Sequence, residues 1–183
     1  MELLSSVFNK VKSTELFTKD YLKVIDIDGS TAIQELDMVV CIPYLVESNT
    51  ILLRYENIPS FELVRPEITK YINVMSQPID TTPEEALKKG LLDKFGIELN
   101  EKKKLEILTP IFSNKTNTSR YHICILPLMS YDYQQIRIED EVVTMGMKEN
   151  NALINITELN NVIVYDLITR YCIDLFKKEF SLF

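Results

Sequence analysis

The residues that bear most directly on chemistry lie in residues 81–99, TTPEEALKKGLLDKFGIEL. Asp93 carries a carboxylate in the second half of this segment, and magnesium prefers oxygen ligands of this kind. One carboxylate alone makes a weak magnesium site, because the ion needs several oxygen ligands. Lys94 follows directly, and its positive charge opposes a metal ion there by Coulomb repulsion. The segment therefore predicts a poor metal site.

The other reactive side chains do not form a recognisable catalytic group. His122 is the only histidine, so a histidine-based triad would depend on it alone, and on an alternating strand a structural role is expected. Cys41, Cys124 and Cys172 are widely spaced among apolar residues, as is typical of buried free thiols in a reducing compartment. The four glycines are too scattered for a phosphate-binding loop. Neither a zinc site nor a nucleophile elbow is indicated.

The segment around Asp93 has the pattern of an amphipathic helix with defined ends. Thr82 can cap the first turn, Pro83 fits its first position, and the two glutamates that follow suit the positive end of the helix dipole. Gly96 predicts the C-terminal end. The apolar side chains between these ends recur near helical spacing: Ala86, Leu87, Leu91 and Phe95. We expect one face of this helix to pack on the rest of the chain.

The residue sequence of this predicted helix resembles the Nudix box, the conserved motif of Nudix proteins. That box reads glycine, five residues, glutamate, seven residues, then Arg-Glu-aliphatic-x-Glu-Glu-x-Gly-aliphatic. Alignment on Gly96-Ile97 puts Lys89 at the arginine, Leu91 at the aliphatic position and Asp93 at the first glutamate of the closing pair. In Nudix proteins the box glutamates lie about one turn apart on one helical face and hold divalent metal ions against a pyrophosphate.

Four positions depart from the box where the family does its chemistry. Met75 replaces the opening glycine, and Thr81 replaces the first glutamate. Gly90 replaces the glutamate after the arginine and offers no oxygen ligand, and Lys94 replaces the last glutamate. A turn that needs positive φ would be strained at Met75, so the loop geometry is expected to differ from that of the family. We expect a retained fold, no cofactor and no metal, with Asp93 as the one weak metal candidate.

The order of the other elements also resembles Nudix proteins, in the ADP-ribose pyrophosphatase branch. The apolar strand Leu36–Val46 and its predicted hairpin mate Ile51–Tyr55 resemble the central hairpin, and Val164–Phe180 resembles the closing helix. The resemblance implies an α/β (α+β) fold, a Nudix-like α/β/α sandwich with a mixed β-sheet. We expect residues 21–183 to form a single Nudix-like domain and residues 1–20 to be a helical extension, packed on this chain or on a partner.

Relatives that cleave ADP-ribose supply a second set of candidates, because some of them place a catalytic glutamate in a loop outside the box. By that resemblance Asp93, Glu139 and Glu141 would form a shifted acidic centre, although a solvated acidic loop is the favoured interpretation of the two glutamates. Arg54, at the end of the second hairpin strand, and Arg120 are the candidates for substrate binding. For Arg54 a surface salt bridge is the favoured alternative.

Composition limits the partners. The chain has 183 residues, of which 46% are hydrophobic, which suits one globular domain. A net charge of -7 argues against direct binding to nucleic acid or to an anionic membrane. The longest apolar run, Met38–Val46, is too short to span a bilayer, and MELLSSVFNK lacks the features of a secretory signal. We therefore expect an intracellular (cytoplasmic) or virion-associated protein that is not secreted by a signal peptide. The Ile-, Asn- and Lys-rich composition suggests an AT-rich genome, viral or bacterial.

Three functions are compatible with these residues. The favoured one is a catalytically degenerate Nudix-fold protein, a pseudoenzyme that acts through protein–protein contacts as a structural subunit of a larger assembly, a viral one included. Nine tyrosines and eight phenylalanines are enough for such an interface. The first alternative is a magnesium-dependent hydrolase of ADP-ribose or a related nucleoside diphosphate derivative that uses relocated carboxylates. The second alternative is a nucleotide sensor that binds without cleaving.

Overall fold

The computed structural model describes residues 13–19, 22–27, 29–56, 71–112, 119–134, 142–144 and 147–181. Its strands are β1 Ser13–Lys19, β2 Leu22–Ile27, β3 Ser30–Gln34, β4 Met38–Leu45, β5 Thr50–Glu56, β6 Tyr71–Asn73, β7 Met75–Pro78, β8 Ile111–Phe112, β9 Arg120–Leu128, β10 Val142–Thr144 and β11 Met147–Asn155. Its helices are α3 Pro83–Phe95, the 3-10 helix η1 Ile156–Asn161 and α4 Leu167–Glu179. None of the helices in these ranges is long and apolar enough to cross a membrane.

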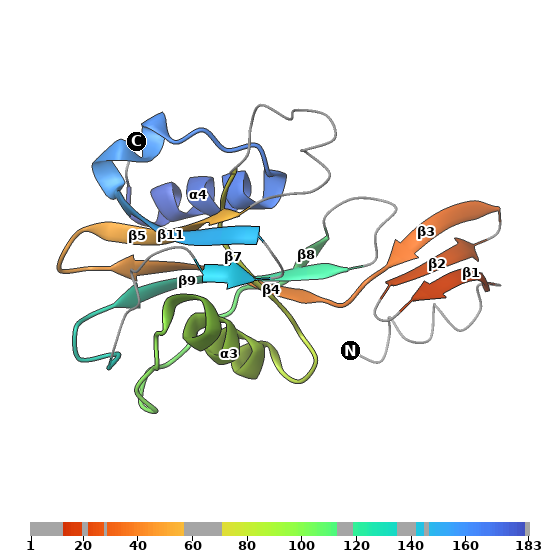
Figure 1. The fold of residues 1–183 in the computed structure, drawn as a ribbon, viewed down its shortest axis with the longest axis horizontal. Helices are drawn as coiled ribbons and strands as arrows, with labels where there is room; N and C mark the ends of the chain where they lie inside the picture. The colour runs from red at the N-terminus through yellow and green to blue at the C-terminus, as the bar shows by residue number, and fades with distance from the viewer. Residues whose placement is uncertain are drawn as a thin grey trace.

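A mixed eight-stranded sheet forms the centre of the molecule, in the order β10-β11-β5-β4-β9-β8, with β6 paired to β5 and β7 paired to β4 (Figure 1). β4 and β9 run parallel, with Met38 opposite Tyr121 and Leu45 opposite Leu128. On its other edge β4 pairs with β7 through residues 38–41 and with β5 through residues 44–45. The described pairings other than β4 with β9 are antiparallel, so the predicted mixed sheet is confirmed.

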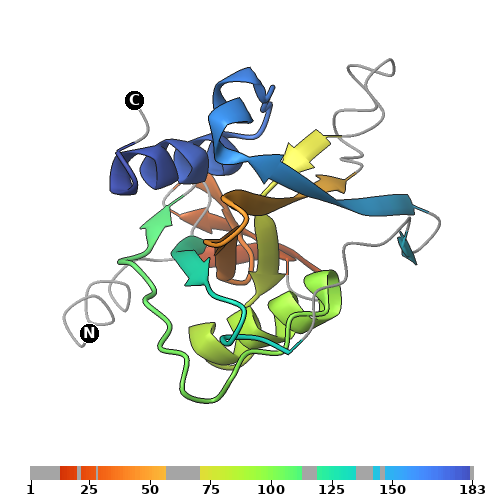
Figure 2. The ribbon, with the colours of Figure 1, turned by 90° about the vertical axis from the view of Figure 1, so that its left-hand side faces the viewer.

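The sheet lies between two helices, with α3 on one face and α4 on the other (Figure 2). The alternation of side chains along β4 explains this arrangement, because successive residues of a strand point to opposite faces. Val39 and Cys41 belong to the apolar cluster that includes the buried face of α3. Val40 and Ile42 belong to the cluster that includes the buried face of α4. The predicted α/β/α sandwich is therefore confirmed.

A second, three-stranded sheet, in the order β1-β2-β3, projects beyond the sandwich (Figure 1). Residues 13–19 were expected to belong to a helical extension, and that prediction is wrong: STELFTK forms β1 and pairs with β2. Its Thr and Phe residues favour an extended backbone, and the pairing with LKVIDI satisfies its backbone hydrogen bonds. The helical spacing near the start of the sequence lies outside the described residues.

Two further predictions about the elements can be compared with the structure. The predicted central hairpin is confirmed as β4 and β5, and Asn49 in its turn has φ 56°, a conformation that Asn tolerates better than most residues. The closing helix begins later than predicted, at Leu167, because the side chain of Asp166 caps it by accepting a hydrogen bond from the Thr169 N–H at 2.6 Å.

Candidate functional site

The helix α3 has the ends that its sequence predicts. The Thr82 side chain accepts a hydrogen bond from the Glu85 N–H at 3.2 Å, Pro83 occupies the first turn, and Gly96 closes the helix with φ 64°. The face toward the sheet is buried: Ala86, Leu87, Gly90, Leu91 and Phe95. The helix is therefore fixed firmly enough to place the box positions relative to the strands.

Gly90 and Met75, two of the departures from the Nudix box, lie against each other. Met75 is fully buried in β7, and a Cβ atom placed on Gly90 would lie only 2.7 Å from its Sδ and 3.1 Å from the Cβ of Gln77. The volume into which a side chain at position 90 would extend is thus filled by the methionine. Met75 lies in β7 and is not among the described residues with positive φ.

Lys94, the third departure, turns its ammonium group toward the strands. Its Nζ donates a hydrogen bond to the carbonyl oxygen of Ser76 at 2.7 Å and lies 3.8 Å from Oε1 of Glu56. The ammonium group is thus held beside β5 and β7 by a carbonyl and a carboxylate, two groups that a metal ion would also use. A second cation in the same place would be repelled.

Arg54 lies beside Lys94 and links α3 to β5 and β11. Its Nε donates to Oε1 of Glu56 at 2.7 Å, and its Nη1 donates to Oδ1 of Asn151 at 3.0 Å and to the carbonyl of Lys94 at 3.3 Å. The guanidinium carbon lies 6.0 Å from the centroid of the Phe95 ring. Arg54 is only 3% exposed, so the surface salt bridge expected for it is wrong: the ion pair exists but is buried.

Sequence reasoning missed three polar members of this cluster: Glu56, Asn73 and Asn151. Nδ2 of Asn73 donates to Glu56 at 3.3 Å, and Nδ2 of Asn151 donates to the Lys94 carbonyl at 3.0 Å. Within the described chain, Oδ1 of Asn73 is a buried acceptor without a hydrogen-bond partner. The i, i+2 spacing of Arg54 and Glu56 on one strand face was the available signal, whereas the two asparagines had none.

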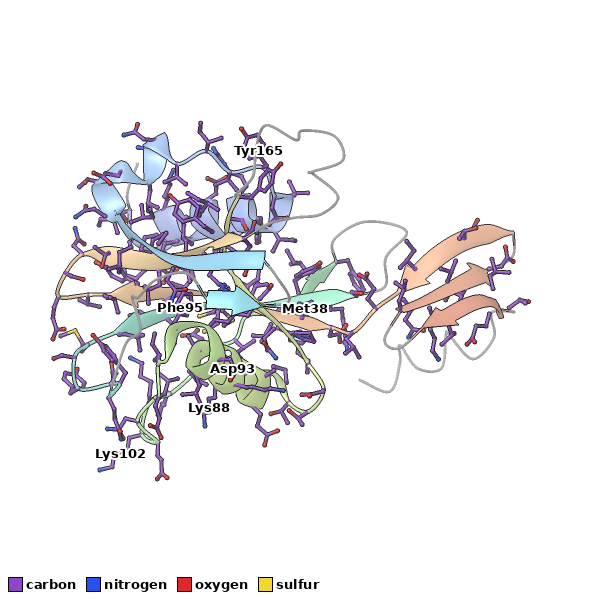
Figure 3. The ribbon with its side chains drawn as sticks, in the orientation of Figure 1. Met38, Lys88, Asp93, Phe95, Lys102 and Tyr165 are labelled. Carbon is purple, nitrogen blue, oxygen red and sulfur yellow. The ribbon has the colours of Figure 1, made fainter. Side chains whose placement is uncertain are left out.

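Asp93 lies on the exposed face of α3, directed away from the buried Phe95 (Figure 3). Thr81, the position of the first box glutamate, is exposed and precedes the helix cap. Glu139 and Glu141, the other members of the expected shifted acidic centre, lie outside the described residues. Within the described ranges no three Asp, Glu, His or Cys side chains converge on a point that could hold a metal ion.

The α3 surface therefore does not fit the magnesium ions that a Nudix box implies. Gly90 supplies no ligand, and the space that a side chain there would need is filled by Met75. The Lys94 ammonium group forms a hydrogen bond with the nearby carbonyl of Ser76. We derive no metal-dependent step at α3.

Arg120, the second candidate for substrate binding, belongs to a separate cluster at the start of β4 and β9. Its Nε and its backbone N–H donate to the Asp37 carboxylate, each at 2.9 Å. Burial by itself raises the pKa of Asp37, but the hydrogen bonds and charge of Arg120 outweigh it and leave the pKa below its usual value. His122 lies 4.0 Å from Asp37, and burial lowers its pKa, which favours the neutral imidazole of a structural residue.

Comparison with known proteins supports the fold. No family model and no curated protein sequence matches the chain. A crystal structure of an ADP compounds hydrolase is similar with a TM-score of 0.66 and 12% identity, over 94% of this chain and 94% of that one. A structure from work on MutT of the fish pathogen Aliivibrio salmonicida and of Vibrio cholerae is similar with a TM-score of 0.51 and 10% identity, over 78% of this chain and 98% of that one.

Both of these proteins have the Nudix fold. At such low identity the likeness shows the fold alone, and the Nudix fold that the sequence resemblance implied is confirmed.

Proposed function

We propose, from a Nudix fold that extends over nearly the whole chain, that the protein hydrolyses a nucleoside diphosphate derivative. The observation that supports this proposal is the likeness to a hydrolase of ADP compounds over 94% of both chains. The substrate class is proposed by analogy with that protein, because a shared fold alone does not determine function.

The geometry of α3 places a condition on this proposal. Because the box positions alone do not fit a metal, a magnesium-dependent hydrolase would need carboxylates from outside the box, and the candidates are Glu139 and Glu141 together with Asp93, the one carboxylate that remains in the box. Arg54 is engaged in the buried cluster, so it orders α3 against the strands and does not face a substrate directly. Arg120 is exposed but paired with Asp37.

The test is incubation with ADP-ribose in the presence of Mg²⁺ or Mn²⁺, with release of AMP as the measurement. We expect turnover that Asp93→Ala abolishes. The matched control is Asp174→Ala, which removes an exposed carboxylate from α4 on the other face of the sheet and should leave turnover unchanged. An absence of turnover with either metal, or equal turnover in the two variants, would contradict the proposal.

The second candidate is a protein that has lost hydrolysis and acts through binding. The packing of Met75 against Gly90 and the position of the Lys94 ammonium group favour it, because both replace groups that the family uses for metal. Such a protein would bind a nucleotide without cleaving it, or would serve as a subunit of a larger assembly with other protein chains.

Two measurements separate these roles. Calorimetric titration of ADP-ribose in EDTA should show binding for a nucleotide sensor and no heat for an assembly subunit. Light scattering should give the mass of one chain for a sensor and a larger mass for a subunit that associates with copies of itself.

A further inference from the structure

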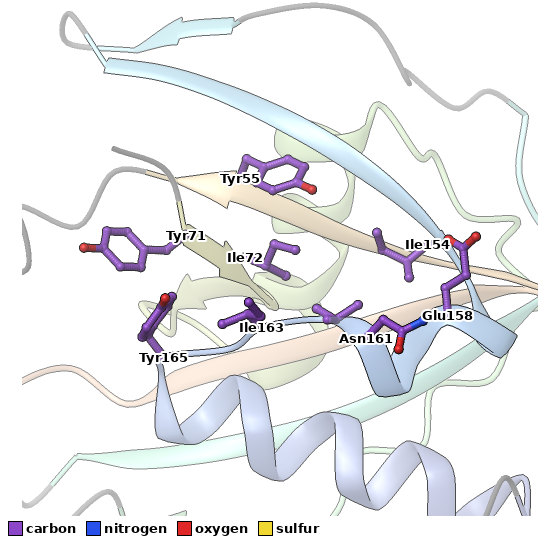
Figure 4. A pocket seen from close by; sticks show the side chains of 9 residues that line it. Tyr55, Tyr71, Ile72, Ile154, Glu158, Asn161, Ile163 and Tyr165 are labelled. Atoms are coloured by element: carbon purple, nitrogen blue, oxygen red, sulfur yellow. The ribbon is translucent and has the colours of Figure 1, made fainter. Parts of the chain in front are cut away.

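A cavity of about 510 Å³ lies on the α4 side of the sheet, away from α3 (Figure 4). Its described lining residues are Tyr55, Tyr71, Ile72, Ile154, Glu158, Asn161, Val162, Ile163 and Tyr165. Tyr55 and Ile72 pack with the apolar cluster that includes Phe176 of α4, so the cavity and the Arg54–Lys94 cluster lie on opposite faces of β5. Its volume is within the usual range for sites that bind small molecules.

The two ends of this cavity differ in chemistry (Figure 4). Tyr71 and Tyr165 lie at one end, in an edge-to-face contact with ring centroids 5.5 Å apart. Glu158 and Asn161 lie at the other end, on η1. Isoleucine side chains lie between the two ends, and the Tyr55 ring forms the wall above them. A ligand that matches this lining has an apolar body and a polar group at one end.

The charge of the lining residues indicates whether the polar group of the ligand is positive or negative. Glu158 is the only charged side chain among the described lining residues, and neither lysine nor arginine is found there. A carboxylate attracts cations. A phosphate or a carboxylate would meet repulsion from Glu158 and no compensating cation in this part of the lining.

We propose that this cavity binds a small organic amine. The ammonium group lies at the end formed by Glu158 and Asn161, and the apolar body of the ligand lies along the isoleucines toward the tyrosine pair. This site is distinct from the α3 surface, so it does not depend on the function proposed above, and its failure would leave that proposal unchanged.

Phenethylamine, phenethyl alcohol and phenylacetate test this proposal, because they share one apolar body and differ in charge. Titration into the ¹⁵N-labelled protein should shift the amide resonances of residues 154–165. We expect the amine to bind about fivefold more tightly than the alcohol, since a partly exposed ion pair with Glu158 contributes up to about 1 kcal/mol. Phenylacetate should bind more weakly than either. Equal affinity for all three, or no shift in these residues, would contradict the proposal.

Single substitutions test which lining residues cause the preference for the amine. Glu158→Gln keeps the shape of an exposed side chain and should reduce affinity for the amine to that for the alcohol, without changing the affinity for the alcohol. Glu84→Gln is the matched control on α3 and should have no effect. Tyr55→Ala should weaken binding of the amine and the alcohol alike. If Glu158→Gln left the preference for the amine intact, the assignment of the charged end would be wrong.

Discussion

Gly90→Ala tests whether the contact between α3 and β7 requires a glycine. At an exposed helical position, replacing glycine by alanine stabilises a protein by about 0.5–1 kcal/mol. At position 90 the new methyl group would lie 2.7 Å from Sδ of Met75 and 3.1 Å from Cβ of Gln77. Met75 is fully buried and can move only by displacing its core neighbours, and Cβ of Gln77 is fixed by the backbone of β7.

The magnitude follows from two opposing terms. Overpacking a core with an extra methyl group costs about 1–3 kcal/mol. The gain in helix propensity offsets about 0.5–1 kcal/mol of that cost. We expect Gly90→Ala to lower the free energy of unfolding by about 1–2 kcal/mol, which corresponds to a fall of about 2–8 °C in Tm for a chain of this size.

Urea unfolding followed by circular dichroism measures this difference. The control is the pair Lys88→Gly and Lys88→Ala at an exposed position of the same helix, where alanine should be the more stable of the two by about 0.5–1 kcal/mol. Because position 88 measures helix propensity alone, a destabilising effect of alanine at position 90 would then be due to packing.

A double-mutant cycle identifies the neighbour responsible. Met75→Ala should cost about 2–5 kcal/mol by itself because it creates a cavity. In that background Gly90→Ala should become neutral or stabilising, since its methyl group enters the vacated volume, with a coupling energy of at least about 1 kcal/mol. The reasoning is refuted if Gly90→Ala stabilises the unmodified protein as alanine does at position 88, or if its effect is the same in both backgrounds.

Three other predictions concern single residues. Arg54→Ala should lower the free energy of unfolding, measured in urea, by about 3 kcal/mol, because it leaves buried partners unpaired. The control Arg170→Ala breaks an exposed ion pair and should change the free energy of unfolding by less than about 0.5 kcal/mol. Asp37 has a lower pKa when folded than when unfolded, so its pairing with Arg120 stabilises the protein above about pH 4 and is lost as the pH falls further. Asp37→Asn should therefore flatten the acid branch of a plot of urea midpoint against pH. Burial raises the pKa of the Cys172 thiol to about 12, so it should react with Ellman's reagent at neutral pH only after unfolding.

The sequence predicted what depends on local pattern. Thr82, Pro83 and Gly96 fix both ends of α3 through interactions within a few residues, and the turn around Asn49 joins two strands that are adjacent in the chain. The start of α4 was placed too early, at Val164, because the apolar Val164 and Tyr165 directly precede the helix although they are not part of it. The cap at Asp166, rather than hydrophobicity, decides where the helix begins.

The polar cluster could not be predicted, because its members are distant in the sequence. Arg54 and Asn151 are 97 residues apart and meet only because β5 pairs with β11. The sequence of β11, MKENNALIN, is too polar to predict a strand inside the sheet. In the same way, the loss of a ligand at Gly90 was visible in the sequence, but its replacement by the Met75 side chain depends on how closely α3 approaches β7.

The three-stranded sheet β1-β2-β3 has no fully buried side chain among its described residues. A sheet of this size whose described side chains are at most partly buried has little apolar burial with which to resist opening. Its backbone amides should therefore exchange with deuterium while those of β4 and β9 are still protected. The chain would then open in two stages, and only the second would report the stability of the sandwich.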